Sequence, residues 1–142
     1  MNETMRKFGY PATLVAEFEH WAVLLRPAQP TLGSLVLAAK SDVTALSDLS
    51  AEAHAEMKLA STAIERALRD FTGYAKINYL MLMMVDPHVH AHVIPRYEGS
   101  RQFEGVDFPD AGWPKLPDLG TAVALDEDQI ASLVTALKTR FT

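Results

Sequence analysis

Three histidines alternate with small apolar residues in one short run of the chain, His88-Val89-His90-Ala91-His92-Val93-Ile94. An imidazole can act as nucleophile, base or acid close to neutral pH. In a β-strand successive side chains point to opposite faces, so the three imidazoles would share one face at spacings of about 7 Å. Three histidines on one face make a poor hydrophobic core, and we therefore interpret this run as a site for chemistry.

The alternative conformation for this run is a helix, on which His88 and His92 would share a face and His90 would point away. β-Branched residues at 89, 93 and 94 favour an extended chain. Pro87 and Pro95 bracket the run, and a proline biases the residue before it away from helical geometry. We therefore expect a strand that Pro95 ends, paired with a strand before it in residues 74–95 through a turn at Asp86-Pro87.

Composition limits the class of protein. The chain has 142 residues, 49% of them hydrophobic, which suits a single domain over residues 1–142 with its core at about 10–96. The absence of cysteine excludes disulfides and is compatible with a cytoplasmic location, which we expect. No apolar run approaches the roughly 20 residues that span a bilayer. The net charge of −5 provides no basic field. We expect neither a membrane nor a nucleic acid as partner.

The remaining elements follow from periodicity and caps. Strands are expected at 21–26 and 34–39, and residues 74–85 read as a strand covered on both faces. A helix is expected from Ala51 to about Phe71, with Ser50 as its N-cap and one apolar stripe formed by Met57, Ala60, Ile64, Ala67, Leu68 and Phe71. An irregular arm over 96–120 precedes a last helix, which a capping box opens. This order predicts an α+β fold, a mostly antiparallel sheet with one long helix packed on it, followed by a C-terminal arm and helix over 97–142.

The triad, followed by Pro95-Arg96, resembles the motif of the histidine triad (HIT) family of nucleotide hydrolases and transferases. The order of elements over residues 20–96 is similar to that family as well. The resemblance implies a HIT-like fold and a homodimer that joins its sheets. It also implies cleavage of a phosphoanhydride or phosphoramidate bond at the α-phosphate of a nucleoside. Carried over to this chain, His90 is the nucleophile, while His88 and His92 bind phosphate oxygens and deliver a proton to the leaving group.

The chain departs from the family pattern at two places. Ser34 follows Gly33 where many members have a fourth histidine, and no Gly-Gln loop precedes the triad. The chain thus resembles a subgroup lacking that loop, with substrate bound by Asn78, Ser34 and Arg96, or by Arg101. No organic cofactor is implied, and magnesium is expected only with a polyphosphate substrate.

Two other functions remain open from the residues alone. A nucleotide-binding module with weak catalysis fits the missing loop, whereas the intact triad argues for an enzyme. A metal site could use two histidines that are two positions apart. All three could not bind one ion, because His88 and His92 lie about 13 Å apart along a strand. Such a site would need an acidic third ligand, for which Asp86 and Glu98 are the candidates.

Overall fold

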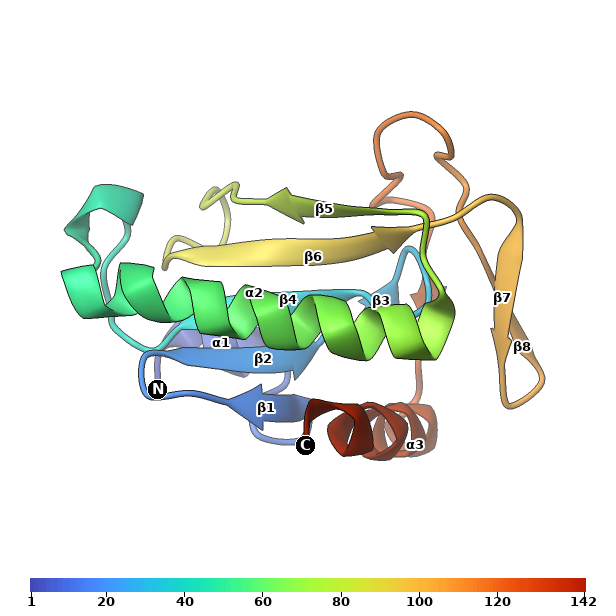
Figure 1. Ribbon diagram of the computed structural model, residues 1–142, viewed down its shortest axis with the longest axis horizontal. Helices are drawn as coiled ribbons and strands as arrows, with labels where there is room; N and C mark the ends of the chain where they lie inside the picture. Colours follow the sequence, from blue (N-terminus) through green and yellow to red (C-terminus); the bar gives the residue numbers. More distant parts are fainter.

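Five antiparallel strands form the sheet that carries the histidine run. In this computed structural model, which describes residues 1–142, their order across the sheet is β1-β2-β4-β6-β5 (Figure 1). Their bounds are β1 Leu14–Glu17, β2 Trp21–Leu25, β4 Leu35–Ala39, β6 His90–Arg96 and β5 Lys76–Leu80. The strand with the histidines therefore lies between β4 and the edge strand β5, and the fold is the α+β arrangement expected from the sequence.

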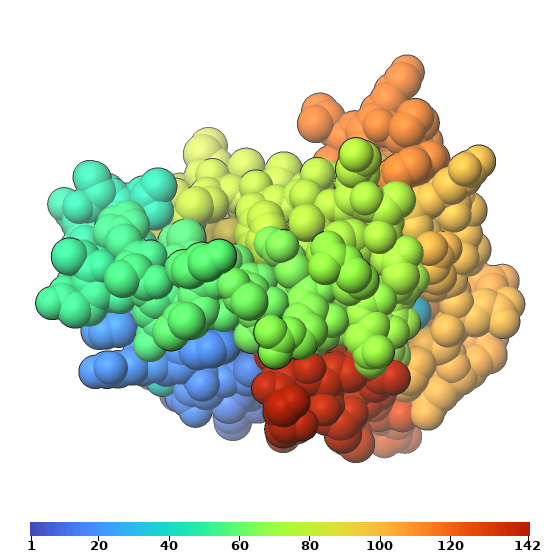
Figure 2. All heavy atoms as spheres, in the orientation of Figure 1, coloured from blue at the N-terminus to red at the C-terminus, as the bar shows by residue number.

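The long helix α2 (Ala51–Thr72) covers one face of this sheet, and the C-terminal helix α3 (Glu127–Lys138) lies beside it (Figures 1 and 2). The hydroxyl of Ser50 accepts the amide hydrogen of Ala53, and Gly73 ends α2 at a positive φ of 61°. The predicted stripe faces the sheet, with Ala60, Ile64, Ala67 and Leu68 buried. No helix has both the length and the apolar character needed to cross a membrane.

A short helix at the N-terminus, α1 (Glu3–Lys7), lies on the other face of the sheet (Figure 1). The side chain of Asn2 caps it by accepting the amide hydrogen of Met5 at 3.0 Å. The same amide group donates to the carbonyls of Ala39 and Ser41, both at 3.0 Å, which ties α1 to the end of β4. Met5 is buried in a small cluster with Ala22, Leu24, Val36 and Ala38. The face that carries the histidines is therefore partly covered.

The C-terminal arm contains more regular structure than its glycine and proline content suggests. A hairpin of β7 (Ser100–Phe103) and β8 (Val106–Pro109) begins it, and β9 (Val123–Ala124) pairs with β3 (Ala28–Gln29). Two short 3-10 helices, η1 (Leu46–Asp48) and η2 (Thr139–Phe141), complete the fold. The prediction of a wholly irregular arm is wrong for residues 100–109, where alternating side chains form a local hairpin.

Strands β5 and β6 are adjacent and antiparallel, as predicted for residues 74–95, but the strand bounds of 74–85 and the tight turn at Asp86-Pro87 are wrong. Only Lys76–Leu80 is strand, and residues 81–89 form an irregular connection. The side chains of Leu82, Met84 and Val85 are 50%, 79% and 83% exposed. The apolar run suggested burial on both faces, but β5 is the edge of the sheet and nothing within the chain covers its far end.

Strand β6 begins and ends two residues later than predicted. It starts at His90, so that His88 lies in a bend before it, and it continues through Pro95 to Arg96. The last pair between β6 and β4 is Leu35 with Val93. Pro95 lies beyond that pair. Its lack of an N–H therefore costs no hydrogen bond between β6 and β4.

Candidate active site

The sheet brings His90 and His92 to the same face, opposite α2. His92 is paired with Val36 and His90 with Ala38, and the two imidazole rings lie 5.1 Å apart at 80° to one another. Val89, Ala91 and Val93 point to the other face and are buried in the main core. The alternation inferred from the sequence thus holds for β6, while His88 reaches the site from the bend that precedes it.

One hydrogen bond decides which nitrogen of His90 is reactive. Nδ1 of His90 lies 2.7 Å from the backbone carbonyl oxygen of His88. A carbonyl oxygen only accepts, so in the neutral form of the ring Nδ1 carries the proton and Nε2 has the lone pair. His90 is only 2% exposed. Nε of Arg140, outside this site, is the one fully buried side-chain nitrogen or oxygen that lacks a hydrogen-bond partner. Nε2 of His90 has no hydrogen-bond partner either and is not completely enclosed, so its lone pair is not engaged within the protein.

His92 is neutral at physiological pH. Burial, the positive charge of Arg26 and the neighbouring His90, in that order of size, lower its pKa to about 4, against a smaller opposing effect of Asp86. Nε of Arg26 lies 3.4 Å from Nδ1 of His92 and donates to it. The remaining ring proton of His92 is therefore on Nε2, which makes this residue a hydrogen-bond donor but not an acid at neutral pH.

The N-terminal segment forms one wall of the site, which the sequence analysis missed. Oγ1 of Thr4, on α1, lies 2.9 Å from Nδ1 of His88. The ring of Phe8 lies 5.7 Å from that of His90 and 5.6 Å from that of His92. The sequence contains a local signal for the start of α1, because Asn2 is a good N-cap residue. Nothing in the sequence pattern, however, indicates that this helix packs beside a strand more than 80 residues away.

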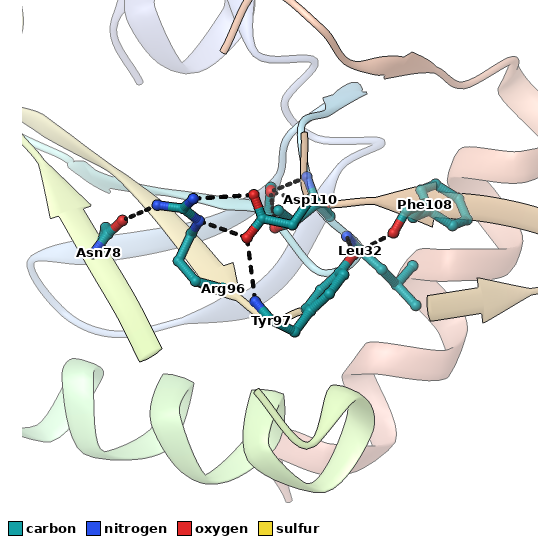
Figure 3. A network of polar contacts seen from close by, with 8 residues as sticks. Leu32, Asn78, Arg96, Tyr97, Phe108 and Asp110 are labelled. Atoms are coloured by element: carbon teal, nitrogen blue, oxygen red, sulfur yellow. Dashed lines mark hydrogen bonds and ion pairs between the residues drawn. The ribbon is translucent and has the colours of Figure 1, made fainter. Parts of the chain in front are cut away.

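The predicted substrate-binding residues Arg96 and Asn78 are bonded to each other and to the arm (Figure 3). Nε and Nη2 of Arg96 donate to the carboxylate of Asp110 at 2.7 and 3.0 Å, and Nη1 donates to Oδ1 of Asn78 at 2.9 Å. Arg96 and Asp110 are both buried. The guanidinium of Arg96 is therefore occupied in holding the arm to the sheet.

Tyr97 extends this network to the turn that precedes β4 (Figure 3). Its hydroxyl donates to the carbonyl of Phe108 at 2.7 Å and accepts the amide hydrogen of Leu32 at 2.8 Å. Ser34 closes the same turn, where its hydroxyl donates to the carbonyl of Thr31 at 2.9 Å and is fully buried. Ser34, Arg96 and Asn78 thus have established partners within the protein, and their contact with substrate stays a prediction.

The residues around the triad do not form the metal site considered above. No group of three or more histidine, aspartate or glutamate side chains is arranged to hold an ion. Asp86, one proposed third ligand, pairs with Lys7 at 2.9 Å. Asp86 is therefore held by Lys7 and does not complete a metal site with two of the histidines.

Comparison with known proteins identifies the family. The HIT domain family model matches residues 7–99, which include the triad and all five strands of the sheet. The chain belongs to the histidine triad family. No curated protein matches the sequence at a significant level.

Solved structures of HIT proteins share the fold. A histidine triad protein from Bradyrhizobium japonicum has a TM-score of 0.72 at 18% identity, with 100% of this chain and 97% of that chain covered. One from Marinobacter aquaeolei has a TM-score of 0.71 at 22% identity, covering 99% and 94%. Plasmodium falciparum diadenosine triphosphate hydrolase has a TM-score of 0.66 at 11% identity, covering 91% and 76%.

Two hollows of this HIT protein flank the edge strand β5, and neither includes a triad histidine. One, of about 400 Å³, lies between α2 and the sheet beside Trp21 and Tyr79. The other, of about 410 Å³, lies between β5 and the arm, where Trp113 contributes to the wall. At the triad, the ring of Phe8 packs against His90 and His92. The triad histidines and these two hollows therefore lie in different parts of the molecule.

The low pKa of His92 predicts a dependence of stability on pH. Its pKa of about 4 in the folded protein lies below the ordinary 6.5. Between those values the unfolded chain binds a proton that the folded chain does not, so the free energy of unfolding falls as the pH falls through this window. We expect His92→Asn to make this decline shallower, measured by urea unfolding at pH 7, 5.5 and 4.5. His54→Asn, at an exposed position, should leave the slope unchanged. Equal slopes for His92→Asn and the wild type would contradict the buried neutral imidazole.

The pair of Arg96 and Asp110 predicts a large loss of stability when one partner is removed. Asp110→Ala leaves a buried guanidinium without its counter-ion, which costs about 3 kcal/mol or more in free energy of unfolding. Glu17→Ala removes an exposed partner of Lys40 and should cost less than about 1 kcal/mol. Chemical denaturation measures both. A cost for Asp110→Ala as small as that for Glu17→Ala would show that Arg96 is not held by this carboxylate.

Proposed function

We propose that this HIT protein hydrolyses or transfers nucleoside phosphates, with His90 attacking the α-phosphorus of a dinucleoside polyphosphate or a nucleoside phosphoramidate. The observation that carries the proposal is the bond from Nδ1 of His90 to the carbonyl of His88, which leaves Nε2 as an unprotonated nitrogen at the site. The HIT family match and the similarity in fold to a diadenosine triphosphate hydrolase support this class of reaction.

The reaction would proceed in two displacements at phosphorus. Nε2 of His90 forms a bond to the α-phosphorus while the bond to the leaving oxygen or nitrogen breaks. Water then attacks the nucleotidyl-imidazole, releases the nucleoside monophosphate and returns the electron pair to Nε2. The leaving group needs a proton in the first step. His92 is neutral and holds a proton that it donates only as a hydrogen bond, so we assign proton delivery to His88, which is only partly buried.

Substrate entry requires a change at the N-terminal wall. His90 is 2% exposed, and the ring of Phe8 lies against both imidazoles. A phosphate group in contact with Nε2 must therefore displace Phe8 from its position in this structure. The reaction needs no organic cofactor, and magnesium would enter only with a polyphosphate substrate.

His90→Ala should abolish turnover while largely preserving nucleotide binding, because it removes the nucleophile and little of the surrounding surface. His88→Ala and His92→Ala should slow the reaction by about 10²–10³, the usual effect of losing one donor to a developing oxyanion. Release of AMP from diadenosine triphosphate and from adenosine phosphoramidate, followed by chromatography, provides the rates. His54→Ala serves as the control for loss of a histidine elsewhere.

Mass spectrometry of quenched reactions should detect one added nucleotidyl group on the wild type and none on His90→Ala. Wild-type turnover by a clean His90→Ala preparation would eliminate the histidine nucleophile. A wild type that binds AMP but turns over neither substrate would instead identify a nucleotide-binding module.

We also propose that the protein is a homodimer that uses the edge of the sheet. The side chains of Leu82, Met84 and Val85 are exposed after the end of β5, and Leu59 on α2 is 63% exposed. Strand β5 is hydrogen-bonded to a neighbour on one side only. An apolar surface next to an unpaired strand edge is suited to a second copy of the chain.

Replacement of Val85 and Leu59 by glutamate should convert the dimer to a monomer, because each charge would be buried in the interface. Sedimentation velocity at micromolar concentration measures the state of assembly. Leu46→Glu, at an exposed leucine outside this surface, should remain dimeric. A monomeric wild type at these concentrations would refute the proposed assembly.

A further inference from the structure

We propose that Arg26 binds the phosphate that is attacked, and that it is the permanent positive charge of the histidine site. This inference rests on the proposed function and names a residue that neither the motif nor the predicted phosphate ligands Arg96, Arg101 and Ser34 include. The group that Arg26 would bind is a phosphate monoester or the α-phosphate of a nucleotide.

Arg26 is placed at the triad by the register of the sheet. It follows the last residue of β2, and its backbone amide donates to the carbonyl of Ser34 at 3.0 Å. Its Nε lies 3.4 Å from Nδ1 of His92. Nη1 donates to the carbonyl of Ala28 at 2.7 Å, which fixes the plane of the guanidinium. Nη2 has no partner within the protein and is not enclosed, so it is free to bind a ligand.

The charge of Arg26 is not neutralised within the chain. The five ion pairs of the structure involve other basic residues, namely Arg6, Lys7, Lys40, Arg96 and Arg140. Asp86, the acidic residue that acts on His92, is paired with Lys7. Arg26 is partly buried, and burial lowers its pKa. A partly buried cation without a counter-ion is costly, which indicates that its partner is a ligand.

The contrast with Arg96 shows what an arginine with a structural role looks like in this protein. Arg96 is buried with two of its nitrogens on the carboxylate of Asp110 and a third on Asn78. Arg26 has one bond to a carbonyl and one long bond to a neutral imidazole. Arg96 is therefore satisfied as it stands, and Arg26 retains both charge and a free donor.

The chemistry of phosphate transfer suits this placement. The free Nη2 of Arg26 carries two N–H donors for phosphate oxygens, and a guanidinium keeps its charge at any physiological pH. His92 beside it is neutral, so Arg26 is what offsets the negative charge that develops on the phosphoryl oxygens as Nε2 of His90 attacks. Arg26 would thus act both in binding the phosphate and in stabilising the transition state.

The test compares ligands with and without a phosphate. In isothermal titration calorimetry, Arg26→Gln should weaken AMP binding by about 10- to 100-fold, the usual effect of losing a charged hydrogen bond. Its affinity for adenosine should be unchanged. Arg26→Lys, which keeps the charge but loses the planar guanidinium, should recover part of the AMP affinity. Arg69→Gln is the matched control, because Arg69 lies on α2 over the ring of Tyr74 and outside the histidine face.

The outcomes separate this inference from the proposed function. If Arg26→Gln and Arg26→Lys fold with wild-type unfolding midpoints and bind AMP as tightly as the wild type, the inference is wrong, even where His90→Ala abolishes turnover. Phosphate-dependent loss of affinity in Arg26→Gln supports it, even where the wild type proves inactive. Equal binding of AMP and adenosine by the wild type would overturn it, since no phosphate site would then exist.

Discussion

The pairing of β6 on both sides is the constraint on which the histidine site depends. With β4 on one side and β5 on the other, the backbone of this strand has no freedom to rotate its side chains between faces. Val89, Ala91 and Val93 are buried beneath α2, and the same alternation forces His90 and His92 onto the opposite face. A shift of register by one residue would exchange the two sets and place imidazoles in the core.

Hydrogen bonds then distinguish three chemically identical side chains. The carbonyl of His88 holds the proton of His90 on Nδ1, and Arg26 faces the Nδ1 of His92. Burial keeps His92 neutral, while His88 lies outside the strand against Thr4. The spacing in the motif therefore supplies three imidazoles, and their surroundings assign a different protonation state or partner to each.

The two arginines near the sheet also differ in their partners, and so in their roles. The chain uses Arg96, Asp110 and Tyr97 as an internal connection between the sheet, the arm and the turn before β4. This network positions the elements around the site without presenting a free charge to it. The cation beside the histidines is Arg26, and its nearest polar contacts are a carbonyl oxygen and an imidazole nitrogen.

Much of the fold could be predicted because its signals are local. The stripe and caps of α2, the capping box at Asp126, and the alternation around His90 each depend on residues within a few positions of one another. Errors arose where a distant neighbour decides the outcome. The apolar run after Tyr74 indicates burial, yet its burial depends on what covers the edge of the sheet. The hairpin of β7 and β8 was not predicted from the glycines of the arm, because turns and irregular loops are rich in the same residues.

For the site, the sequence alone determined the triad, the common face of His90 and His92, and the family to which the motif belongs. The tertiary structure decided that α1 and Phe8 cover this face, that Arg96 is paired with Asp110, and that Arg26 lies at His92. The physical reason is that periodicity reports which way a side chain points from its own element, whereas pairing between charges depends on the distance between elements. Arg26 and Arg96 have the same side chain, and only the position of one carboxylate separates their roles.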